Sequence, residues 1–117
     1  MVEESKCLTC IARGIDFGFR RAVAEGAIER ENWNVAREWV ESVKETINKL
    51  KENQCLDKEG EEYLESWMER LSHALNEKNK EKALEAIKNL DFSHAMLQYA
   101  YTVCEEELIE VCRRRKY

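Results

Sequence analysis

The sequence contains no proline and only four glycines, so few of its residues interrupt a helix. Charged residues make up 37% of the chain, and Glu and Lys, which have good helix propensity, dominate them. No segment has the pattern of a β-strand. These features together predict an all-α protein.

Long apolar runs are also absent. No run approaches the ~20 residues that span a bilayer, and the first residues, MVEESK, lack the apolar region of a signal peptide. The net charge of −5 argues against a general affinity for nucleic acid. We therefore expect a cytoplasmic protein without a membrane-spanning segment.

Glutamine is scarce beside abundant Glu and Lys, a balance associated with hyperthermophiles. The origin of the chain matters because disulfides are rare in most cytosols but common inside hyperthermophilic archaea and bacteria. The thermophile-like composition therefore makes disulfide bonds compatible with an intracellular protein.

Apolar spacing divides the chain into helical segments that we expect to pair as two αα-hairpins. The first covers about residues 9–30, the second follows Asn32 or Asn34 and ends near Asn53, and the third follows Asp57 and ends near residues 77–79. The inward side of the first helix is expected to hold Leu8, Ile11, Ile15, Phe19, Ala22, Val23 and Ile28. The expected fold is one helical domain, residues 1–117, arranged as an antiparallel four- or five-helix bundle.

The last segment, from Lys80 onward, allows two interpretations. Apolar residues alternate at spacings of four and three from Ala83 to Val111, which favours one long helix. Asp91 and Ser93 are potential helix caps, which favours a kink or break near residue 91. Both remain open from the sequence alone.

The two expected hairpins also align with each other. A shift of 47 residues places Asn32 on Asn79 and Ala36 on Ala83. This alignment indicates tandem hairpins of similar construction.

Small residues occupy every fourth position of the first helix, at Gly14, Gly18, Ala22 and Gly26. Such a stripe lets a partner backbone approach closely. It predicts either a tight contact inside the domain or a dimer seam. Trp33, beside the first hairpin turn, is a further candidate anchor for a partner.

Four of the five cysteines lie near the chain ends, at Cys7, Cys10, Cys104 and Cys112. Cys104 and Cys112 are separated by about 12 Å of helical rise, so both cannot bind one zinc ion. With Cys7–Thr9 extended, that rise matches two disulfides, Cys10–Cys104 and Cys7–Cys112; buried reduced thiols are the alternative. Cys55 is then left as a free thiol or an intermolecular bridge.

The sequence contains no recognisable catalytic set or phosphate-binding loop. We therefore expect a non-enzymatic interaction module or small assembly subunit that binds a protein partner or a second copy, with no cofactor assigned. One alternative is a metal- or redox-active bundle, whose candidate ligands are Glu69, His73, Asp91 and His94. Another is a nucleic-acid regulator that uses Arg20, Arg21 and the Arg-rich C-terminal residues.

Overall fold

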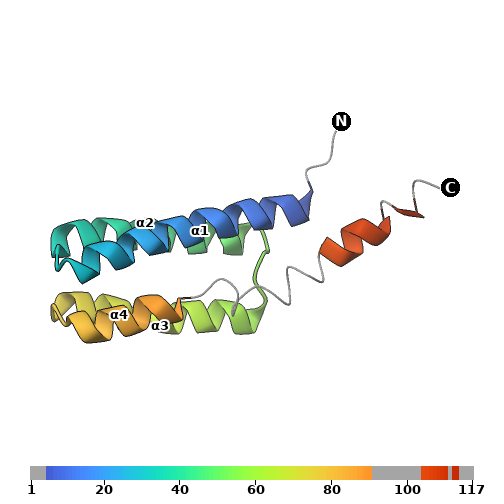
Figure 1. Cartoon of the computed structure of the whole chain (residues 1–117). Helices are drawn as coiled ribbons and strands as arrows, with labels where there is room; N and C mark the ends of the chain where they lie inside the picture. The colour runs from blue at the N-terminus through green and yellow to red at the C-terminus, as the bar shows by residue number, and fades with distance from the viewer. Residues whose placement is uncertain (1–4, 91–103, 111, 114–117) are drawn as a thin grey trace.

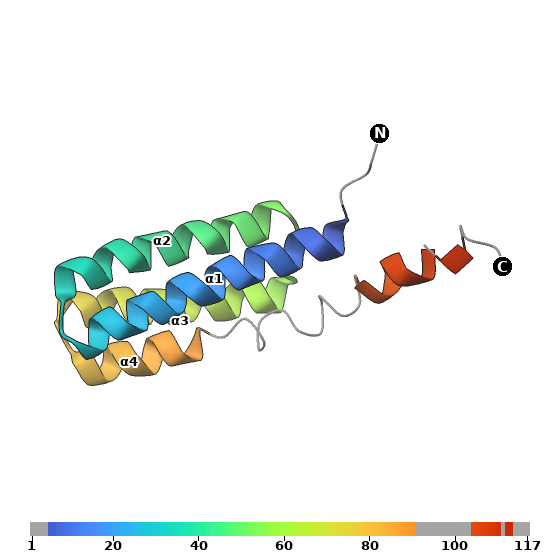
Figure 2. The same cartoon turned by 45° about the horizontal axis from the view of Figure 1, so that its top comes forward.

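The computed structural model describes residues 5–90, 104–110 and 112–113. Its helices are α1 (Lys6–Glu29), α2 (Trp33–Glu52), α3 (Lys58–Asn76) and α4 (Lys80–Asn89), and the two described C-terminal stretches are also helical. Figures 1 and 2 show α1 and α2 as one hairpin and α3 and α4 as another, packed together as an antiparallel bundle. The all-α fold built from two hairpins is confirmed.

Polar side chains cap the starts of α1, α3 and α4, whereas Asn32 before α2 makes no side-chain cap hydrogen bond. The side chain of Asp57 accepts a hydrogen bond from the Gly60 N–H at 2.7 Å, as the sequence predicted, and Asn79 caps α4 in the same way. Ser5 accepts from the Leu8 N–H at 3.2 Å, so α1 begins at Lys6 rather than near residue 9. Such caps satisfy backbone donors that have no partner inside the helix.

The turns inside the two hairpins share one backbone geometry. Glu31 and Lys78 adopt left-handed φ values of 55° and 52°, and they lie 47 residues apart in the sequence. The next residue in each turn donates its N–H five residues back, from Asn32 to Ala27 and from Asn79 to Ala74. This is the Schellman arrangement that ends many helices. Gln54, in the turn between the hairpins, has the same geometry, with φ 57° and the Cys55 N–H donating to Leu50 O, so this arrangement is not specific to the 47-residue alignment.

Helix α4 ends at Asn89, because Leu90 leaves the helical region with ψ 76°. Two side chains satisfy carbonyls at this end: the Tyr63 hydroxyl donates to Asn89 O at 2.7 Å, and Arg21 Nη1 donates to Ile87 O at 3.2 Å. Of the two interpretations of the last segment, the structure supports the break. Residues 91–103 lie outside the described residues.

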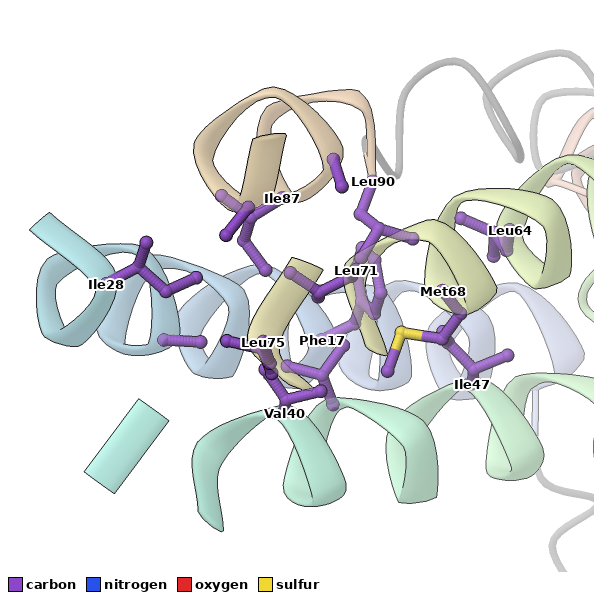
Figure 3. Packing of buried hydrophobic residues seen from close by; sticks show 14 of the residues in the cluster. Phe17, Ile28, Val40, Ile47, Leu64, Met68, Leu71, Leu75, Ile87 and Leu90 are labelled. Carbon is purple, nitrogen blue, oxygen red and sulfur yellow. The ribbon is translucent and has the colours of Figure 1, made fainter. Parts of the chain in front are cut away.

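The core lies between the hairpins and centres on Phe17 of α1, which is fully buried. Figure 3 shows Phe17 pointing into the space where Val40 of α2 and Leu71 and Leu75 of α3 also converge. Helix α1 contributes a line of buried residues to this core: Cys10, Gly14, Phe17, Ala24, Ala27 and Ile28.

This inward face corrects the sequence prediction for α1. Leu8, Ile11, Ile15 and Phe19 were expected to point inward, and all of them are exposed. The reason is that α1 has apolar residues on two opposite faces, and apolar spacing alone does not say which face meets α2 and α4. Among the described residues, no helix is long and apolar enough to cross a membrane.

Candidate interaction surface

The outer face of α1 carries large apolar side chains that contact no core. Leu8, Ile15 and Phe19 are 67%, 68% and 63% exposed, and Ile11 is 41% exposed. At about 100° of rotation per residue, Leu8, Ile15 and Phe19 lie within about 40° of one another and opposite Phe17. The spacing therefore places them in one line along the helix.

We define the outward stripe as the apolar residues on this face of α1: Leu8, Ile11, Ala12, Ile15, Gly18, Phe19 and Ala22. No charged residue belongs to it. A helix that is apolar on all sides is normally buried. Isolated exposed apolar residues are common on protein surfaces, but a continuous patch marks a binding surface. The outward stripe is therefore the strongest candidate site among the described residues.

The small-residue stripe divides between the two faces of α1. Gly14 is buried on the inward side. A Cβ added to Gly18 would meet no atom within 4 Å, and one added to Gly26 would meet only Arg30 Nη2 at 4.0 Å. No tight contact inside the described structure therefore explains glycine at positions 18 and 26. Ala22 is exposed beside them.

Trp33 opens α2 and is half-buried, with part of its ring packed against the core. An anchor for a partner is a side chain that gains much burial on binding. Because the core already covers part of Trp33, it has less area to offer than the residues of the outward stripe.

The cysteines pair differently from the prediction. Disulfides join Cys7 to Cys104 and Cys10 to Cys55, and Cys112 is a free, exposed thiol. The predicted pairs Cys10–Cys104 and Cys7–Cys112 are wrong, and so is the prediction that Cys55 is left over. The error has a physical source: Cys7 lies inside α1, not in an extended lead-in.

The sequence held a signal that Cys55 lies level with Cys7 and Cys10, but not for which of the two it bonds. Because α2 runs back along α1 from the turn at Glu31, a residue 24 positions after Glu31 lies level with one about 24 positions before it. Cys55 is therefore level with the start of α1. Cys55 and Cys10 are almost completely buried, with 0% and 2% exposure.

A carboxylate adds hydrogen bonds to the Cys7–Cys104 disulfide link at the start of α1. Glu107 accepts hydrogen bonds from the Ser5 hydroxyl and from the Cys7 N–H, the latter at 2.9 Å. The Ser5 bond is the main reason that the pKa of Glu107 lies below its ordinary value, and the Cys7 N–H adds to it. An anion at a helix N-terminus also interacts favourably with the helix dipole.

The C-terminal helical segment, residues 104–110, which Cys104 links to α1, also has exposed apolar side chains. Leu108 and Ile109 are 64% and 46% exposed. They follow Cys104, which is bonded to the side of α1 that carries Cys7. Cys7 lies about 40° from Ile11 around the helix, at the edge of the outward stripe, and Leu8, Ile15 and Phe19 stay exposed beside this attachment.

The candidate metal ligands divide between described and undescribed parts of the chain. Glu69 and His73 are exposed on α3, where they line a hollow of about 360 Å³ between α2 and α3. Asp91 and His94 lie outside the described residues. Within the described ranges, no three His, Cys, Asp or Glu side chains gather closely enough to hold a metal ion.

Comparisons with protein-family models, with curated proteins and with solved structures find no match for this chain.

Proposed function

We propose that this protein is a non-enzymatic interaction module and that the outward stripe of α1 is its contact surface. The observation that carries the proposal is the exposure of Leu8, Ile15 and Phe19 on a helix whose opposite face forms the core. Fully burying a side chain of this kind contributes about 1.5–3 kcal/mol. A partner that covers the stripe gains most of that contribution at each residue.

The disulfides support this proposal by fixing α1 in place. Cys10–Cys55 ties α1 to the loop between α2 and α3, and Cys7–Cys104 ties its first turn to the C-terminal helical segment. A surface held in its binding conformation loses less conformational freedom when it binds. The two disulfides thus hold the outward stripe on a helix that is fixed in position.

The same bonds bear on where the protein works. Disulfides persist in oxidising compartments and inside hyperthermophiles. We infer a setting of one of these kinds, and the thermophile-like composition is compatible with a cytoplasm of the second kind.

Photo-crosslinking tests the proposal. A photoreactive benzoylphenylalanine replaces Phe19, and a matched variant carries it in place of Glu62, which is exposed on α3. Irradiation of cells that naturally make the protein is expected to give a covalent adduct with a polypeptide at position 19 and not at position 62. Equal labelling at both positions, or no adduct at position 19, would overturn the proposal.

A further inference from the structure

The outward stripe has a property that points to one occupant. We propose, on the basis of the function proposed above, that it binds a second copy of itself, with the two α1 helices antiparallel and a two-fold axis at Ile15. Homo-oligomers of this kind use the same surface on both subunits, so the surface has to be complementary to itself.

The stripe meets this requirement position by position. Between Leu8 and Ala22, which bound the seam, reversing the helix about Ile15 exchanges each residue of the stripe with a residue of the stripe; Gly26, on the same face beyond it, would pair with Glu4, which lies outside the described residues. The exchange pairs Leu8 with Ala22, Ile11 with Phe19, Ala12 with Gly18, and Ile15 with its own copy. No charged residue enters the seam.

Side-chain size adds to the match. The large side chain of Leu8 faces the small Ala22 of the second copy, and Ala12 faces Gly18 where a Cβ would find open space. The Leu8–Ala22 pair sets a large residue against a small one, and the two small residues of the Ala12–Gly18 pair leave room for a close approach of the backbones. The remaining pairs are large against large, and together the four pairs allow the usual 8–10 Å between helix axes. This arrangement assigns a role to glycine at position 18, where an added Cβ would meet no atom within 4 Å among the described residues.

Charges at the edge of the stripe are already paired inside the chain. Arg20 Nε lies 2.9 Å from Asp16 Oδ1, and the Arg20 guanidinium also donates to Ser42 on α2. Docking at the stripe therefore leaves this ion pair intact. Burying an unpaired charge would have opposed association.

The available area indicates a weak dimer. With about 150–200 Å² for a side chain of this size, the exposed parts of Leu8, Ile11, Ile15 and Phe19 amount to roughly 400 Å² per copy. The two copies together then contribute roughly 800 Å² from these side chains, below the ~1,000 Å² expected of a stable biological interface. We therefore expect a reversible dimer that forms with rising concentration.

Sedimentation equilibrium of the oxidised full-length protein tests the inference. The wild type should show a concentration-dependent monomer–dimer equilibrium. Ile15→Glu should weaken it at least tenfold, because it places two like charges on the axis. Ser66→Glu, which adds the same charge on α3, should leave it unchanged. Circular dichroism checks that each variant stays folded.

The register is tested by oxidative cross-linking in a Cys112→Ser background, which removes the free thiol. Ile15→Cys should form a covalent dimer, because the axis sets this residue against its own copy. Leu8→Cys should not, because the two copies of residue 8 are about 20 Å apart along the helix. Efficient cross-linking through residue 8 would overturn the antiparallel pairing.

The outcomes separate this inference from the proposed function. If the wild type stays monomeric at all concentrations, or if Ile15→Glu does not affect the dimer, the proposal that the outward stripe binds a second copy is overturned. If the position-19 crosslink then joins a different protein, the interaction function stands. If it joins none, both fail.

Discussion

Glu107 shows how one carboxylate ties the C-terminal helical segment to the first turn of α1. It receives hydrogen bonds from the Ser5 hydroxyl and the Cys7 N–H, and both favour its charged form. Sequence reasoning did not identify this contact, because Glu107 is one of many Glu residues and only the Cys7–Cys104 bond brings it to α1.

The lowered pKa of Glu107 predicts a specific pH dependence. A carboxyl group whose pKa is lower in the folded protein stabilises the fold above its ordinary value, about 4.5, and that contribution is lost as the pH falls through the folded pKa. The amide resonance of Cys7, followed by NMR, should therefore titrate with a midpoint below about 4.5. Glu107→Gln should remove the step. A midpoint at or above 4.5 would contradict the assignment.

Lys78 is a second residue with a measurable consequence. Its left-handed conformation, φ 52°, costs a residue with a Cβ about 1–2 kcal/mol, and glycine avoids most of that cost. Lys78→Gly should raise the free energy of unfolding by about 0.5–1 kcal/mol in urea denaturation. This figure is the relief of the left-handed strain minus the cost of the greater conformational entropy that glycine gives the unfolded chain. Lys82→Gly, inside α4, should lower it by about 1 kcal/mol. A loss of stability in both variants would argue against this turn geometry.

At the scale of elements, the sequence predicted the helices better than their faces. The cap at Asp57 and the two hairpins follow from local rules, because capping depends on residues only a few positions apart. The inward face of α1 does not follow from such rules. Since Phe17 and Ile15 both lie on apolar lines, only the packing against α2 and α4 decides which is buried.

The sequence indicated which helix carries the candidate site but not which large apolar residues form it. The small-residue stripe at Gly18 and Ala22 lies on the outward face, so that pattern pointed to the correct helix. The large residues beside it, Leu8, Ile15 and Phe19, were assigned to the core, and so the sequence did not reveal the apolar surface. The disulfide pairing was missed because Cys7 was placed outside the helix.

At the scale of the whole molecule, the two disulfides connect elements that are distant in sequence. They close loops with sequence separations of 97 and 45 residues. In the chain-entropy account, a crosslink of either span stabilises the fold by about 4–5 kcal/mol. The Cys7–Cys104 bond holds the C-terminal helical segment, and the Cys10–Cys55 bond lies in the core of the bundle.

The difference in burial predicts an order of reduction. Cys7 and Cys104 are half-buried, whereas Cys10 and Cys55 are almost fully buried. A mild reductant under native conditions should therefore open Cys7–Cys104 first, because thiol attack needs access to a sulfur. Intact mass after alkylation should show one label without reductant, on Cys112, and then three. A direct step from one label to five, or earlier loss of Cys10–Cys55, would contradict this order.

Hydroxyl-radical footprinting of the purified protein at increasing concentration tests whether the outer face of α1 is an interaction surface. The account predicts that Phe19 is oxidised readily in dilute solution, as its 63% exposure requires, and becomes protected as copies associate. Phe17, fully buried, should stay unreactive throughout and serves as the internal control. A Phe19 as unreactive as Phe17 even in dilute solution would contradict the account, because the outward stripe would then be covered within the chain itself.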